Sequence, residues 1–188
     1  MSRSIVINVL LFQVGWFSCV LGGAYSKPLL GSVIVVAVIV YHLYQAKELK
    51  QEISLLIIAL IIGFIFESLM TYMDLAVYTV GQFHPAIAPY WMILMWPLFA
   101  TTLNLSMRWL KELSALFVAI IGGVFAPLAY LAGSKLGAVE YDNTVTSLSV
   151  IAFSWTALFP VLVVASSKLN GFKKTQDSVV NVEVARHV

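Results

Sequence analysis

Residues 53–73 have the sequence ISLLIIALIIGFIFESLMTYM, and their length and apolar character indicate the fold class. These 21 residues would rise about 31 Å as an α-helix, which matches the roughly 30 Å hydrocarbon core of a bilayer. Glu67 is the only charged residue among them. The stretch therefore predicts a transmembrane helix that carries one carboxyl group within the membrane.

The rest of the chain repeats this pattern. Of its 188 residues, 61% are hydrophobic and only 11% are charged, whereas a soluble domain carries about 25% charged residues. We therefore predict an all-α fold, a polytopic membrane bundle of six transmembrane helices over residues 1–168. A polar tail, disordered in this interpretation, follows at residues 169–188. The other five spans are predicted at residues 5–22, 28–46, 89–107, 113–133 and 146–167.

The positive charges predict the orientation of the bundle. With the N-terminus in the cytoplasm, nine of the 11 Lys and Arg residues fall on the cytoplasmic side, and only Lys27 and Lys135 fall outside. This bias satisfies the positive-inside rule, so both ends of the chain are predicted to be cytoplasmic. The nine residues are Arg3, Lys47, Lys50, Arg108, Lys111, Lys168, Lys173, Lys174 and Arg186.

Several classes of function are disfavoured by composition and motifs. No basic face interleaved with aromatic residues indicates a nucleic-acid partner. Cys19 is the only cysteine, so neither an internal disulfide nor a multi-cysteine metal site is expected. The histidines and carboxylates lack the spacing of metal ligands, and no P-loop, dinucleotide turn or nucleophile elbow is present. We therefore predict no metal and no cofactor.

Glu67 is the most informative candidate residue. It lies about 21 Å along its helix from the cytoplasmic end, in the outer third of the bilayer. A charge there costs on the order of 2–3 kcal/mol unless it is paired or neutralised, so Glu67 should face the bundle interior. Thr71 and Asp74 follow on the same helix face. The alternative is structural, in which Glu67 is neutral and hydrogen-bonded or reaches the nearby interface.

Aromatic and polar residues from other spans complete the candidate set. Trp91 is typical of the aromatic belt at the membrane surface, while Trp96 lies deeper and is expected to wall a pocket together with Tyr130. Asn104 belongs to a second polar track nearer the cytoplasm, where hydrogen bonding between helices is the ordinary role. The predicted ligand-binding candidates are Glu67, Thr71, Asp74, Trp91, Trp96, Tyr130 and Asn104.

A stripe of small residues marks the fifth predicted span. Ala115, Ala119 and Gly123 recur at four-residue spacing, which permits close contact between helices in lipid. The stripe predicts either a central place for this span in the bundle or a contact with a membrane partner.

The segments FESL at residues 66–69, PYW at 89–91 and WPLFATTL at 96–103 carry a family resemblance. With them, the chain resembles a family of small bacterial inner-membrane proteins known only as a domain of unknown function. The resemblance covers about residues 5–167. It implies a multi-pass protein of the bacterial cytoplasmic membrane with a role related to fatty acids or envelope lipids. It supplies no active-site residue.

The sequence is compatible with four functional hypotheses. The preferred one is a non-enzymatic protein that binds, presents or moves a lipid-like amphipathic molecule through a pocket in the outer half of the bilayer. The first alternative is an intramembrane lipid-modifying enzyme with Glu67 as acid or base, assisted by His84 or Asp74. The others are a structural or assembly subunit and a small proton-coupled transporter.

Overall fold

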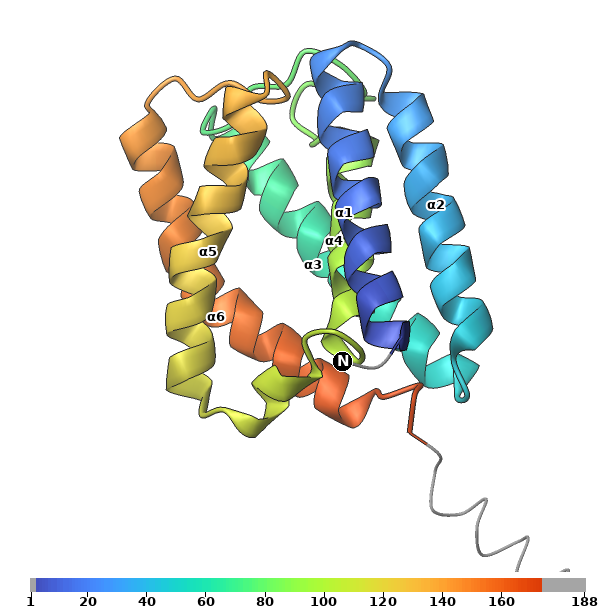
Figure 1. Cartoon of the computed structure of the whole chain (residues 1–188). Coiled ribbons are helices and arrows are strands. Elements are labelled where there is room, and N and C mark those ends of the chain that lie inside the picture. The colour runs from blue at the N-terminus through green and yellow to red at the C-terminus, as the bar shows by residue number, and fades with distance from the viewer. Residues whose placement is uncertain (1–2, 174–188) are drawn as a thin grey trace, which may run out of the picture.

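The computed structural model describes residues 3–173, which form a bundle of six α-helices (Figure 1). Within this part of the chain the only β-type pairing is an isolated bridge between Val77 and Glu140. The prediction of a helical membrane bundle is confirmed. The elements are α1 (Arg3–Ala24), α2 (Pro28–Gln45), α3 (Leu49–Tyr72), α4 (Tyr90–Leu103), the 3-10 helix η1 (Arg108–Glu112), α5 (Ala115–Lys135) and α6 (Thr144–Lys168).

Helix α4 is shorter than the predicted span. It has 14 residues, whereas the other five helices are long and apolar enough to cross a bilayer. The prediction that it continues to Met107 is wrong, because the chain turns after Leu103. The side-chain carbonyl of Asn8 in α1 accepts hydrogen bonds from the backbone amide and the hydroxyl of Ser106, at 3.3 and 2.6 Å. This contact holds the turn against α1.

The centre of the bundle is α4 and not α5. Nine of the 14 residues of α4 are buried, because α1, α2 and α3 all pack against it. In α5 only four of 21 residues are buried, and α5 packs against α6. The prediction that the small-residue stripe places the fifth span centrally is therefore wrong.

The glycines of α5 explain its contact with α6. A Cβ atom on Gly122 would lie 2.6 Å from the carbonyl oxygen of Trp155, and one on Gly123 would lie 2.8 Å from Thr156 Cγ2. Gly123 thus serves packing within the chain. Ala115 is exposed and Ala119 is partly exposed, so a membrane partner at this end of the stripe stays a prediction.

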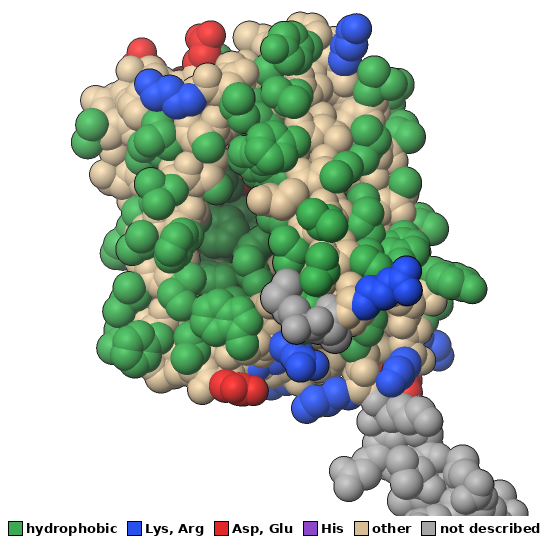
Figure 2. Space-filling model, in the orientation of Figure 1, with side chains coloured by type: hydrophobic (Ala, Val, Ile, Leu, Met, Phe, Trp, Pro, Cys, Tyr) green, Lys and Arg blue, Asp and Glu red, His purple; other side chains and the backbone are tan. Residues whose placement is uncertain are grey.

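One end of the bundle carries most of the basic residues. The N-terminus, the α2–α3 turn, η1 and the end of α6 all lie at this end, and Lys and Arg side chains gather there (Figures 1 and 2). We call it the basic end. The positive-inside rule predicts that this end faces the cytoplasm, and the orientation stays a prediction.

The first residues of the predicted tail are placed in the structure. Residues 169–173 follow α6 and lie against the α2–α3 turn, where the amides of Lys47 and Glu48 donate to the carbonyl oxygen of Gly171 at 2.7 and 2.9 Å. The remainder of the predicted tail, residues 174–188, lies outside the described residues.

Candidate functional site

An apolar cavity of about 470 Å³ lies between the α1–α4 side of the bundle and the α5–α6 pair. Figure 2 shows it as a hollow lined by hydrophobic side chains, open on the face between α1 and α5. None of its 21 lining residues is charged. Ten of them are aromatic: Phe12, Trp16, Trp91, Trp96, Phe99, Trp109, Phe125, Tyr130, Trp155 and Phe159.

The cavity runs along much of the bundle. Its lining includes Trp91 and Gly133 towards the end opposite the basic end, and Met107 and Trp109 at the basic end. A pocket confined to the outer half of the bilayer was predicted, and that prediction is wrong. Met107 and Trp109 follow α4 in the chain, so their place in the lining carries the cavity past the end of that helix.

Glu67 lies behind the wall of this cavity and not in its lining. Its side chain is fully buried, and its Oε1 accepts hydrogen bonds from Trp96 Nε1 at 2.9 Å and from the hydroxyl of Tyr130. Its Oε2 accepts from the hydroxyl of Tyr78 at 3.4 Å. Trp96 and Tyr130 line the cavity, so the carboxyl group fixes the positions of two wall residues.

The other predicted partners of Glu67 serve different purposes. The hydroxyl of Thr71 donates to the backbone carbonyl of Glu67 at 2.9 Å, a contact within the helix. Asp74 follows the end of α3 with a φ of 56° and is exposed. His84 accepts from the amide of Ala86 at 3.1 Å within its own loop. The structure thus brings neither Asp74 nor His84 into contact with Glu67.

Trp91 is not a residue of a surface belt, and that interpretation is wrong. It is 1% exposed, and its Nε1 donates to the carbonyl oxygen of Val80 at 3.1 Å. The loop that follows α3 folds over the end of the bundle and covers the indole ring. Trp91 therefore closes the cavity at this end.

Trp155 also belongs to the site, and it was not among the predicted residues. It lies in the middle of α6, lines the cavity and stacks on Trp96 with ring centroids 5.0 Å apart. Its side chain is buried, yet Nε1 has no hydrogen-bond partner in the described structure. A tryptophan far from either end of its span was the available signal.

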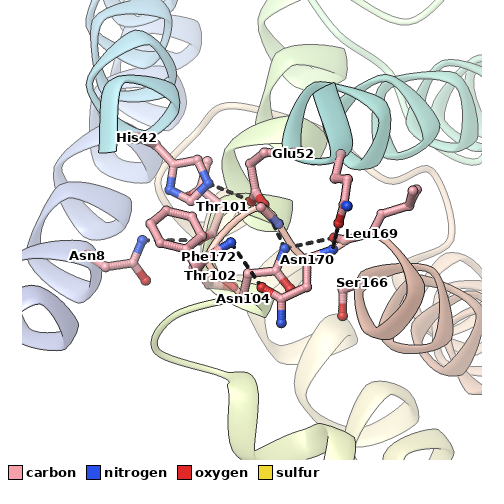
Figure 3. Close-up of polar contacts among 12 residues, drawn as sticks. Asn8, His42, Glu52, Thr101, Thr102, Asn104, Ser166, Leu169, Asn170 and Phe172 are labelled. Atoms are coloured by element: carbon pink, nitrogen blue, oxygen red, sulfur yellow. Dashed lines mark hydrogen bonds and ion pairs between the residues drawn. The ribbon is translucent and has the colours of Figure 1, made fainter. Parts of the chain in front are cut away.

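A second polar cluster lies at the basic end (Figure 3). Glu52 is fully buried and accepts from His42 Nε2 at 2.7 Å and from Asn104 Nδ2 at 2.7 Å. The amide of Gly171 donates to Glu52 Oε2 at 3.0 Å. Asn104 therefore belongs to this cluster and not to the cavity.

The cluster forms where two helices meet. Glu52 lies in the first turn of α3, and His42 near the end of α2 is 3% exposed. A turn of a few residues brings the end of α2 against the start of α3, so the two side chains meet and bury each other.

Lys111 extends the cluster towards η1. Its Nζ donates to Asn104 Oδ1 and to the carbonyl oxygen of Ser166, the latter at 2.9 Å. Burial lowers the pKa of Lys111 to about 8, although the charge of Glu52 opposes this shift. The cluster thus connects α2, α3, η1 and residues 169–173, and its contacts favour a structural role.

The chain matches the family model described as proteins of unknown function (DUF2878) over residues 5–161, and it belongs to that family. The predicted membership in an uncharacterised family is confirmed. No curated protein and no solved structure matches the chain. The family brings no molecular function with it, so function must be argued from the cavity and the two polar clusters.

Proposed function

We propose that this membrane protein binds a lipid-like amphipathic molecule in the cavity and admits it sideways from the bilayer, with a bacterial cytoplasmic membrane as the setting. The observation that carries the proposal is the cavity itself. It measures about 470 Å³, has no charged lining residue and opens between two lipid-facing helices. Pockets for small molecules occupy about 300–1,000 Å³ and are mostly apolar.

Energetics favour an occupant made of hydrocarbon. At roughly 24 cal/mol per Å³, an empty void of this size would cost on the order of 10 kcal/mol. Water would find few hydrogen-bond partners among the lining residues, and buried water needs about two to four such partners. Acyl chains are present at the opening and fill the space without either penalty.

The alternatives have less support. An acid–base enzyme needs an assisting group near Glu67, but His84 bonds within its own loop and Asp74 is exposed after the end of α3. A proton-coupled transporter needs a polar path, but no described hydrogen bond links the Glu67 cluster to the Glu52 cluster. A purely structural subunit predicts a filled interior, which the cavity opposes.

The test uses the tryptophans as reporters, because all five of them line the cavity. The protein is reconstituted in vesicles whose phospholipids carry brominated acyl chains, which quench tryptophan fluorescence on contact. Gly133→Leu is the blocking variant, since a Cβ atom at this lining position meets nothing within 4 Å. Ala132→Leu is the matched control, because it adds the same bulk at the neighbouring exposed residue of α5.

We expect strong quenching in the unaltered protein and in Ala132→Leu, and clearly weaker quenching in Gly133→Leu. Lipid that co-purifies with each protein, measured by mass spectrometry, should fall in the same order. Equal quenching and equal lipid content in the two variants would refute the proposal.

A further inference from the structure

We infer that the cavity selects a ligand whose polar group is an uncharged hydroxyl, held between Tyr130 of α5 and Trp155 of α6. This inference rests on the proposed function and names the class of its ligand: a long-chain or isoprenoid-type lipid alcohol. It follows from the donors and acceptors that line the cavity.

The hydroxyl of Tyr130 offers the ligand an acceptor and not a donor. The hydroxyl of Tyr130 donates to Glu67 Oε1, the same oxygen that accepts from Trp96 Nε1. A carboxyl group accepts both bonds when it is ionised or carries its proton on Oε2. The lone pairs of Tyr130 Oη remain for a partner that donates.

Trp155 offers the complementary group. Its indole N–H can only donate, and no described group accepts from it. The side chain is 8% exposed, so the N–H is shielded from water as well. A buried donor without a partner destabilises the ligand-free state. A ligand oxygen that meets this N–H as the indole ring turns towards the cavity removes that penalty.

The two side chains are neighbours in the wall of the cavity. The rings of Tyr130 and Trp155 meet edge to face with centroids 6.5 Å apart, and both residues line the cavity. A hydroxyl group donates one hydrogen bond and accepts others. It can therefore donate to Tyr130 Oη and accept from Trp155 Nε1, which leaves neither group without a partner.

Other polar groups fit less well. A carboxylate accepts from Trp155 but has no proton for Tyr130, and the carboxyl group of Glu67 lies directly behind Tyr130. An ammonium group donates to Tyr130 but leaves Trp155 without a partner. No charged residue lines the cavity to balance either ion. A plain alkane satisfies neither group.

The experiment is a competition against brominated-chain phospholipid in detergent micelles, read from tryptophan fluorescence. The competitors are dodecanol, dodecanoic acid, dodecylamine and dodecane, which differ only in the terminal group. We expect dodecanol to relieve the quenching at about tenfold lower concentration than the other three, because it gains two hydrogen bonds. In Tyr130→Phe, which lacks only the hydroxyl, the concentration of dodecanol that relieves the quenching should approach that of dodecane.

Two further variants make the assignment specific. Trp155→Phe removes the indole N–H and should also reduce the preference for dodecanol, which gives an independent reading if Tyr130→Phe does not fold. Tyr141→Phe is the control: its hydroxyl lies near this site, 3.4 Å from the carbonyl oxygen of Tyr130, but outside the lining. It should leave the preference unchanged.

The outcomes separate the two proposals. Equal relief by all four competitors, or an unchanged preference in Tyr130→Phe and Trp155→Phe, would overturn the selection of an alcohol and leave lipid binding intact. No relief by any competitor would overturn the proposed function and this inference together.

Discussion

Gly63 of α3 allows Trp96 of α4 to pack against the helix backbone, and replacing it with alanine should damage the wall of the cavity. A Cβ atom at Gly63 would lie 2.2, 2.4 and 2.6 Å from Cγ, Cδ1 and Cβ of Trp96. Because the backbone fixes the position of Trp96 Cβ, a change of rotamer leaves the 2.6 Å contact in place. The two helices must separate, or Trp96 must leave its place.

The expected cost follows from what Trp96 loses. Overpacking a tight core costs about 1–3 kcal/mol. Displacement of the indole ring also breaks its 2.9 Å hydrogen bond to Glu67, and a buried polar group left without its partner costs about 1–3 kcal/mol. Alanine recovers about 1 kcal/mol through its higher helix propensity. The net loss of unfolding free energy in Gly63→Ala is therefore about 1–5 kcal/mol.

The assay is unfolding in mixed micelles, in which dodecyl sulfate is titrated against a mild detergent and helicity is followed by circular dichroism. Gly133→Ala is the matched control: the same substitution in a membrane helix, at a position where the new Cβ meets nothing within 4 Å. It should be neutral or slightly stabilising. Unfolding free energies for the two variants within about 0.5 kcal/mol of each other would refute the packing argument, since surface-like changes stay within that range.

Two further predictions concern the cluster at the basic end. Glu52→Ala leaves the donors of Asn104 and Gly171 without their carboxyl partner, so it should lower the free energy of unfolding by about 3–5 kcal/mol. It should also speed amide hydrogen exchange at Gly171, measured by mass spectrometry. Replacement of the exposed Glu112 by alanine should change neither quantity. Lys111, with its pKa lowered to about 8, binds its proton more weakly in the folded than in the unfolded state. Unfolding free energy should therefore rise between about pH 8 and about pH 10.5, and this rise should be absent in Lys111→Met.

Each of these predictions has a contradicting result. Unchanged exchange at Gly171 in Glu52→Ala would show that other contacts hold residues 169–173 in place. Parallel pH profiles for the unaltered protein and Lys111→Met would show that the lysine titrates alike in both states.

Parts of the candidate site could be anticipated from single residues. Glu67 was expected to turn inward because a carboxyl group in lipid is costly, and the structure buries it completely. Trp96 and Tyr130 were expected beside a pocket, and both line the cavity. Their joint attachment to Glu67 could not be anticipated, because the three residues come from α3, α4 and α5.

Hydropathy and charge along the chain predicted the helical membrane fold, the positions of the helices to within a few residues and the end of the bundle that is basic. Hydropathy, span length and charge are properties of consecutive residues, so they can be read along the chain. The same properties fixed Glu67 as a buried carboxyl group inside the membrane.

The packing of the helices could not be predicted: α4 is central, α5 packs against α6, and a cavity opens between this pair and the rest of the bundle. It also decided that Glu52 meets His42 and that the indole N–H of Trp155 has no partner. The physical reason is the solvent. In lipid, the faces that pack and the faces that meet acyl chains are equally apolar, so composition does not reveal which helices are neighbours. Residues 53–73 predict a transmembrane helix from their own composition, but their contacts with α4 and their place beside the cavity depend on the other helices.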